Sequence, residues 1–194
     1  MQKKIGLALL GMLCIACLQA QNRRFDTTMK LGKTGYRVNS TNRNPDKNMV
    51  TISPIGFENT ARDVSIEVKG RIRKSEVDDL NADGFPDLLL YVFPEDAKNK
   101  GSVIAISSDK NQGYAPIFFP DIVDDPKIRT GYMGNDQFAL MEGTLVRRFP
   151  VYATADTTDL KPTGTMRQVM YRVQRDEKGT LRFRVTRTYD FNKP

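Results

Sequence analysis

The amino-acid sequence predicts an all-β fold: a single domain built as an antiparallel sandwich or a strongly curved sheet. Three observations support this prediction. Apolar residues recur at every second position in several segments, which is the spacing of a strand. Turn-forming glycine, proline and asparagine residues separate these segments. No segment keeps a helical spacing of apolar residues over three turns, so the pattern favours packed antiparallel sheets.

Three segments alternate apolar with polar residues and are predicted strands: 64–68, 169–173 and 181–186. Such alternation is typical of a strand with one face on a hydrophobic core and the other in water. The charged segment Gln174–Gly179 lies between the last two strands and ends on a glycine. We therefore expect a hairpin there.

Three further segments are apolar without alternation: 88–93, 102–107 and 114–119. This composition predicts strands that are buried on both faces. The polar segment 94–101 separates the first two and is predicted to be a turn or loop. Pro116 lies inside the third segment, and because proline lacks a backbone N–H we expect an edge strand or a bulge there.

Gly143 separates two more predicted strands, 138–140 and 145–152. Short helical turns are expected near 44–47 and 120–126, where proline and aspartate gather. No stretch of the sequence has the composition of a linker. The strands are therefore expected to share one domain.

Residues 1–20 have the composition of a signal peptide. Lys3 and Lys4 give a positive start, residues 5–18 form an apolar run, and Ala20 is a small residue suited to cleavage. The apolar run is short for a bilayer-spanning helix. We therefore expect residues 1–20 to be removed, residues 21–194 to fold, and the protein to be periplasmic or secreted, as in a Gram-negative cell envelope.

Cys17 is also a candidate for lipid attachment. The position three residues before it is Cys14, where lipid-attachment signals place a leucine. This departure argues against a lipid anchor at Cys17. Cleavage after Ala20 would remove both cysteines of the chain, so a domain without disulfides must be stabilised by its own core.

The composition of the mature chain excludes several kinds of catalytic site. The chain has no histidine, and its two cysteines lie in the leader. A serine–histidine dyad, a thiolate nucleophile and an ordinary zinc, copper or haem site are therefore excluded. We predict that the protein is not an enzyme. A glycan hydrolase that uses Asp79, Asp83 or Asp87 is the weakest alternative, because no partner carboxylate stands out elsewhere in the sequence.

One short segment has the oxygen-rich spacing of a calcium loop. Side-chain or carbonyl oxygens occupy loop positions one, three, five, seven and nine, with a glycine at position six, and the predicted ligands are Asp79, Asn81, Asp83, Phe85 (through its carbonyl) and Asp87. Hard oxygen ligands at this spacing suit Ca²⁺. The predicted role of the ion is structural.

The same segment has a second interpretation without metal. Aspartate and asparagine side chains often accept hydrogen bonds from backbone N–H groups and so close a turn by themselves. Position twelve is Leu90, where a helix–loop–helix calcium site requires a bidentate glutamate. The sequence leaves both interpretations open.

Arginines are frequent in the C-terminal third of the chain. A basic face made by them could meet an acidic polymer or an anionic membrane surface. The plainer interpretation, which we favour, is that Arg182 and Arg184 form the solvent-exposed face of an alternating strand. Export makes nucleic acid a poor candidate partner. The arginines concerned are Arg147, Arg148, Arg167, Arg172, Arg175, Arg182, Arg184 and Arg187.

Four segments carry a resemblance to a known family. They are Glu-Val-Asp-Asp-Leu-Asn-Ala-Asp-Gly at 76–84, Gly-Tyr-Met-Gly-Asn-Asp-Gln-Phe-Ala at 131–139, Leu-Val-Arg-Arg-Phe-Pro-Val-Tyr at 145–152, and Lys-Pro-Thr-Gly-Thr-Met-Arg-Gln at 161–168. In order and approximate spacing they resemble the periplasmic inhibitors of I-type (invertebrate) lysozyme. The resemblance implies a β-rich homodimer that pushes a loop into the substrate cleft of a lysozyme.

The inhibitory loop of this family carries a serine and a tyrosine three residues apart. Here Ala97 and Lys100 stand at the matching positions, so neither of those two roles can be carried over. Our hypothesis is an altered contact loop, whose lysines pair with the carboxylates that flank the scissile bond in a glycosidase cleft. The contact residues would be Lys98, Asn99, Lys100, Gly101 and Ser102.

Two alternatives to this hypothesis remain. In the first, the loop is a charged surface hairpin that contacts nothing. The net charge of the chain favours this alternative: it is +7, falls to +5 without Lys3 and Lys4, and would slow docking to a basic lysozyme. The whole chain can instead be a calcium-stabilised β module that binds envelope polysaccharide or another envelope protein.

Overall fold

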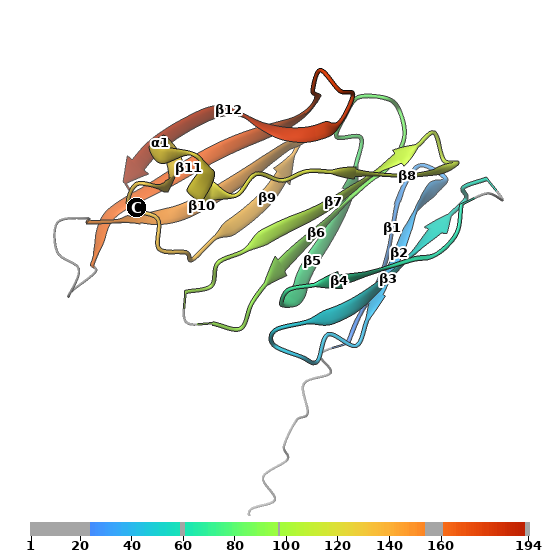
Figure 1. The fold of residues 1–194 in the computed structure, drawn as a ribbon, viewed down its shortest axis with the longest axis horizontal. Coiled ribbons are helices and arrows are strands. Elements are labelled where there is room, and N and C mark those ends of the chain that lie inside the picture. Colours follow the sequence, from blue (N-terminus) through green and yellow to red (C-terminus); the bar gives the residue numbers. More distant parts are fainter. Residues whose placement is uncertain (1–23, 59–60, 97, 154–160, 193–194) are drawn as a thin grey trace, which may run out of the picture.

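The computed structural model describes residues 24–58, 61–96, 98–153 and 161–192, and strands make up most of this part of the protein (Figure 1). Its strands form three antiparallel four-stranded sheets that pack together, so the predicted fold class is confirmed. The predicted signal peptide at 1–20 and its Cys17 lie outside the described residues. In the described part of the chain, no helix is long and apolar enough to cross a bilayer.

The central sheet has the strand order β5 (Arg71–Asp78), β6 (Asp87–Phe93), β7 (Ser102–Asp109), β8 (Gly113–Ile117). Every residue of β6 is buried, because the other two sheets cover both faces of the central one. The prediction of a strand buried on both faces at 88–93 is therefore confirmed. Pro116 lies in β8, an edge strand that pairs along its length only with β7 among the described strands, as expected.

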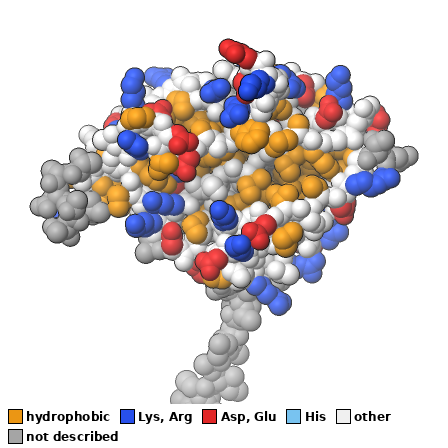
Figure 2. Space-filling model, viewed as in Figure 1, with side chains coloured by type: hydrophobic (Ala, Val, Ile, Leu, Met, Phe, Trp, Pro, Cys, Tyr) orange, Lys and Arg blue, Asp and Glu red, His pale blue; other side chains and the backbone are white. Residues whose placement is uncertain are grey.

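One outer sheet has the strand order β1 (Phe25–Leu31), β2 (Thr34–Ser40), β3 (Asn48–Ile55), β4 (Val64–Val68). Its buried apolar side chains pack against one face of the central sheet. The sheets lie close where β1 meets β5. Half-buried Ile66, Ile104 and Tyr114 border this core. Figure 2 shows a band of hydrophobic side chains on one face of the molecule.

The other outer sheet has the strand order β12 (Leu181–Asn192), β11 (Pro162–Arg175), β10 (Thr144–Tyr152), β9 (Gln137–Met141). It packs against the second face of the central sheet through a core rich in aromatic rings. Along one side the two sheets are joined by backbone bonds: the Phe118 N–H donates to Leu181 O at 3.0 Å, and the Phe183 N–H donates to Phe118 O at 2.9 Å.

The two predicted helical turns have different outcomes. A 3-10 turn, η1 (Ile122–Asp124), and a single helical turn, α1 (Pro126–Arg129), occupy the region predicted near 120–126. The prediction at 44–47 is wrong. There the Asn44 side chain accepts the Asp46 N–H at 2.8 Å and the Lys47 N–H at 3.3 Å, which closes an asparagine turn and not a helical one.

Candidate functional site

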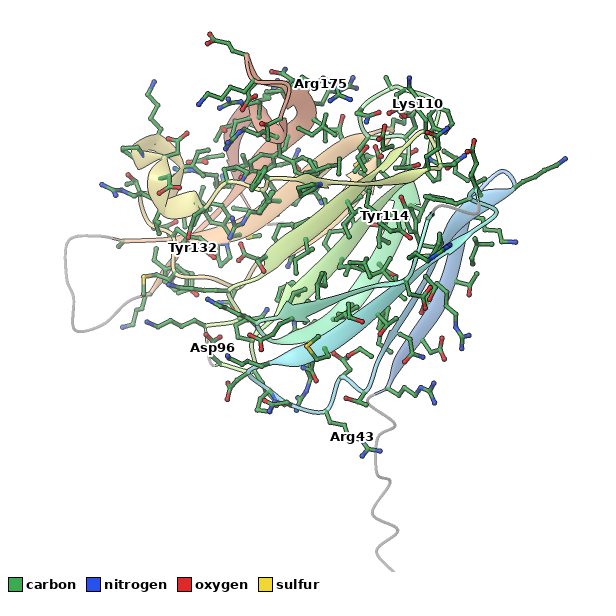
Figure 3. All side chains as sticks on the ribbon, turned by 45° about the vertical axis from the view of Figure 1, so that its right-hand side comes forward. Arg43, Asp96, Lys110, Tyr114, Tyr132 and Arg175 are labelled. Carbon is green, nitrogen blue, oxygen red and sulfur yellow. The ribbon has the colours of Figure 1, made fainter. Side chains whose placement is uncertain are left out.

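The predicted contact loop connects β6 to β7 at one end of the central sheet. Figure 3 labels Asp96 at this end and Lys110 at the opposite end, in the β7–β8 turn. The side chains of Asp96, Lys98 and Lys100 are exposed, whereas Asn99 is half-buried and Gly101 is buried. The loop therefore presents its charged side chains to solvent while its backbone is held against the protein.

A local turn shapes the tip of this loop. The Asp96 carboxylate accepts the N–H of Lys98 at 3.1 Å and that of Asn99 at 2.6 Å. Asn99 has a φ of 49°, in the left-handed region that asparagine tolerates better than most residues. These two residue types therefore fix the turn that orients both lysines.

The segment 133–136 holds the C-terminal half of the loop through its backbone. The Asn135 N–H donates to Lys98 O at 2.8 Å, and the Asp136 N–H donates to Asn99 O at 3.3 Å. Gly134 makes this approach possible, because a Cβ at that position would lie 2.0 Å from Lys98 O. Two backbone hydrogen bonds and a close backbone contact thus hold the loop against this segment.

The Asp136 carboxylate, which lies in the protein interior, also holds the β6–β7 loop. It accepts the Gly101 N–H at 2.8 Å and the Tyr132 hydroxyl at 2.6 Å. It also accepts two N–H groups of Arg147, from Nε at 2.7 Å and from Nη2 at 2.9 Å. The Asp136 side chain has no exposed surface and that of Arg147 is 3% exposed. Charge-assisted bonds of this kind are the strong ones in a protein interior.

Aromatic rings surround the Arg147 guanidinium. Its Cζ lies 5.1 Å from the ring centre of Tyr132, 5.5 Å from that of Phe138 and 5.9 Å from that of Phe119. Burial disfavours the charged form of Arg147, but the hydrogen bond and charge of Asp136 outweigh burial, so the pKa of Arg147 is raised. Burial likewise raises the pKa of Tyr132. The Arg147 guanidinium therefore stays charged at any physiological pH.

Of the two arginines interpreted as the solvent face of a strand, Arg184 is exposed on β12 and Arg182 is half-buried, whereas Arg147 lies in the core. A signal in the sequence could have found this buried arginine. Leu145, Arg147 and Phe149 alternate along one strand, so the guanidinium shares a face with two core residues.

A hollow of about 340 Å³ lies beside the last residues of the loop. Its lining includes Lys100 and Ser102 near the end of the loop, Val123 of η1, and the Tyr132 and Arg147 side chains of the Asp136 network. The Lys100 Nζ lies 5.7 Å from the Tyr132 ring centre. The arrangement offers a mixed aromatic and cationic surface next to the exposed loop.

The predicted calcium loop connects β5 to β6, and its side chains close a turn. The Asp79 carboxylate accepts the N–H of Asp83 at 3.0 Å and that of Gly84 at 2.9 Å. Asn81 Oδ1 also accepts the Asp83 N–H at 3.0 Å, and Asp83 Oδ1 accepts the Phe85 N–H at 2.9 Å. These bonds are those of the turn interpretation, in which backbone donors occupy the carboxylates.

The fifth predicted ligand, Asp87, is fully buried at the start of β6. Its carboxylate accepts the N–H of Leu80 at 2.9 Å and that of Ser108 at 3.2 Å. Burial raises the pKa of Asp87 to about 6. Among the described residues, no three acidic, histidine or cysteine side chains converge to hold a metal ion. The oxygen donors suit calcium chemically, but they are engaged in the turn, and calcium binding stays a prediction.

The two predicted sites lie at opposite ends of β6. That strand has seven residues, so at a rise of about 3.3 Å per residue the separation is roughly 20 Å. A calcium ion in the β5–β6 loop would therefore not touch the β6–β7 loop.

Comparison with known proteins adds no relative. No protein-family model matches the chain, and no curated protein matches it. The resemblance to inhibitors of I-type lysozyme rests on the four sequence segments alone. In the fold, the segments at 131–139 and 145–152 supply Asp136 and Arg147, which hold the β6–β7 loop.

Proposed function

We propose that the protein is an exported inhibitor of a lysozyme and blocks the substrate cleft of that enzyme with the β6–β7 loop. The observation that carries the proposal is the attachment of the loop at Lys98, Asn99 and Gly101 while its lysine side chains stay in solvent. A loop that is already ordered loses little conformational entropy when it binds.

The charge of the loop supports the proposal. Glycosidase clefts carry two carboxylic groups that flank the scissile bond. Among the described residues, no carboxylate forms an ion pair with Lys98 or Lys100. Both ammonium groups therefore remain available to a carboxylate of the partner, and the pairing strengthens once water is excluded.

A panel of lysozymes tests the proposal. Lysis of peptidoglycan by lysozymes of several classes is followed with and without the purified mature protein. We expect inhibition of at least one class, at a stoichiometry near one loop per enzyme. If every lysozyme of the panel lyses peptidoglycan at its uninhibited rate, the proposal is wrong. The resemblance also implies a homodimer, which sedimentation of the same preparation would test.

A second candidate function follows from the β5–β6 loop, whose oxygen-rich sequence suits Ca²⁺. In this alternative the protein is a calcium-stabilised module that binds envelope polysaccharide or another envelope protein. Calcium-dependent stability together with glycan binding and no inhibition in the lysozyme panel would favour it.

A further inference from the structure

A second hollow lies beside the first residues of the β6–β7 loop. It measures about 300 Å³ and is lined by Asn42, Arg71, Arg73, Phe93 and Glu95, among others. It shares no lining residue with the hollow near Tyr132. Its charged lining residues are two arginines and one glutamate, so the hollow carries a net positive charge.

Arg71 is the inner cation of this hollow. Its Nη2 donates to Arg43 O at 2.8 Å, and its Nη1 pairs with the Glu95 carboxylate. The remaining guanidinium nitrogen of Arg71, Nε, is buried, and its N–H has no acceptor among the described residues. A buried charged donor without an acceptor costs free energy. Arg71 therefore has a hydrogen-bonding capacity that the described fold does not use.

Arg73 supplies the second cation. It lies at the irregularity between Ile72 and Lys74, where β5 shifts its register against β6. Its Cζ lies 4.2 Å from the ring centre of Phe93, so the guanidinium plane is supported by an aromatic face. Within the described ranges, no carboxylate forms an ion pair with Arg73.

The inner wall of the hollow is fixed because Asn42 is fully engaged. Its Nδ2 donates to Ile72 O at 2.9 Å, and its Oδ1 accepts the Ile72 N–H at 2.9 Å. Asn42 is 6% exposed. Glu95, in contrast, has a side chain that is half exposed and lies on the loop. The one acidic group among the lining residues is thus already half in solvent.

We propose that this hollow is a binding site for a carboxylate group and that Glu95 occupies it in the free protein. An incoming carboxylate pairs with Arg71 and Arg73 after the Glu95 side chain turns into solvent. Guanidinium groups bind planar carboxylates through two parallel N–H···O bonds, and the unused Nε–H of Arg71 supplies a donor for this geometry. The inference does not depend on lysozyme inhibition.

Glu95 limits the affinity of the site for an external ligand. Because it is tethered next to Arg71, its effective concentration at the site is high, on the order of millimolar or more. A free carboxylate must compete with it. Removing its charge should therefore strengthen binding, although the change removes an ion pair from the surface.

The test uses the folded mature protein and acetate as the probe. The Nε–H resonances of the arginines are followed by NMR during titration with sodium acetate at constant ionic strength, for the wild type and for Glu95→Gln. We expect a saturable shift of the Arg71 Nε–H, with a dissociation constant about five-fold or more lower in Glu95→Gln. Arg184 and Arg187, exposed on β12, serve as internal controls and should not show saturation.

Three outcomes would overturn the inference. The Arg71 resonance stays unshifted in Glu95→Gln, or it shifts no more than those of the control arginines, or inorganic phosphate binds as tightly as acetate. The backbone amide spectrum of each sample shows whether the fold is retained. Because no lysozyme is present, failure here leaves the proposed inhibition untouched, and failure of the lysozyme panel leaves this site untouched.

Discussion

Asp136 is the residue on which the shape of the β6–β7 loop depends most. It joins the loop at Gly101 to Tyr132 and Arg147, and all its partners are donors. Asp136→Asn keeps the shape of the side chain but leaves the Arg147 charge buried without a counter-charge. We expect a loss of about 3–5 kcal/mol in the free energy of unfolding, measured by urea denaturation.

A paired variant separates the ion pair from general damage to the core. Replacing both charges, as Asp136→Leu with Arg147→Met, should recover a large part of the lost stability, since no buried charge remains. Tyr132→Phe, which removes one hydroxyl, should cost only about 1 kcal/mol. If Asp136→Asn is as stable as the wild type, the described network does not hold the loop.

Gly134 offers a second test at a single residue. Its φ is 100°, and a Cβ there would meet Lys98 O, whereas Gly164, with a φ of 85°, has no atom within 4 Å of the place where a Cβ would stand. An alanine at either position carries left-handed strain of about 1–2 kcal/mol. Only Gly134→Ala adds a backbone clash, so we expect it to cost at least about 1 kcal/mol more.

The comparison of these two glycine variants is made by urea denaturation and by amide chemical shifts. Gly134→Ala should move the resonances of Lys98, Asn99 and Gly101, and Gly164→Ala should leave them in place. Equal stability of the two variants would show that the close approach to Lys98 O is not maintained in solution.

Single residues were the hardest part of the site to predict. The exposed lysines of the loop were predicted from charge and turn chemistry, and their exposure agrees with that expectation. The sequence does not pair Arg147 with Asp136, because this aspartate lies eleven positions away in a loop. Tertiary packing decides which buried charged residues pair with one another, and the local sequence around each residue does not reveal that pairing.

Among the elements, α1 depends on a single arginine of β11. The Arg167 Nη1 donates to the carbonyl oxygens of Lys127, Ile128 and Thr130, and its Nε and Nη2 bind the Asp190 carboxylate at 2.7 and 2.8 Å. A cation at the C-terminal end of a helical turn satisfies carbonyl groups that the turn leaves unpaired. Arg167 therefore anchors α1 to the sheet.

The Arg167–Asp190 pair predicts a pH dependence. The hydrogen bond from Arg167 lowers the pKa of Asp190 in the folded protein. This pair therefore stabilises the fold fully above the unfolded pKa of about 3.9 and loses its effect as the pH falls through the lower folded pKa. Because Asp190 is partly exposed, we expect Asp190→Asn to cost less than about 1 kcal/mol at pH 7.

The measurement is the free energy of unfolding of Asp190→Asn and wild type at pH 7 and at about pH 2.5. The difference between the two proteins should be present at pH 7 and should shrink at the acidic pH. A difference that stays constant across this range would mean that the carboxylate charge contributes nothing to the anchoring of α1.

The strands that the sequence predicts best are those with strong patterns. The segment 64–68 coincides with β4, and the apolar run 88–93 lies within β6. β5 was not predicted, since five of its eight residues are charged and its register is interrupted near Arg73. An edge strand needs only a few inward residues to pack, so its alternation is weak.

At the scale of the whole molecule, burial of β6 on both faces was predictable and the three-layer arrangement was not. An apolar run without alternation, such as 88–93 in β6, requires cover on two sides. Which strands provide that cover depends on pairing between distant segments, such as the bonds from Phe118 to Leu181 and Phe183. The sequence therefore indicates how many faces are buried, but not which sheet buries each of them.

Calcium would act on the stability of the whole domain. If the β5–β6 loop binds Ca²⁺, a concentration 100-fold above Kd should add about 2.7 kcal/mol and raise the melting temperature by roughly 5–10 °C. Calorimetry with calcium and with a chelator measures the shift, and Asp83→Asn, at an exposed position, serves as the control that should lose it. An unchanged melting temperature would contradict calcium binding, and only the interpretation of the loop as a metal-free turn would remain.

The central claim is that the lysine-bearing loop between β6 and β7, which the protein holds at Lys98, Asn99 and Gly101, blocks a lysozyme. The measurement that tests it most directly is the inhibition constant of the double variant Lys98→Ala, Lys100→Ala against a lysozyme that the wild type inhibits, with Lys178→Ala at the exposed β11–β12 turn as the control. We predict an increase of at least about ten-fold for the double variant and none for the control. An inhibition constant equal to that of the wild type would contradict the claim.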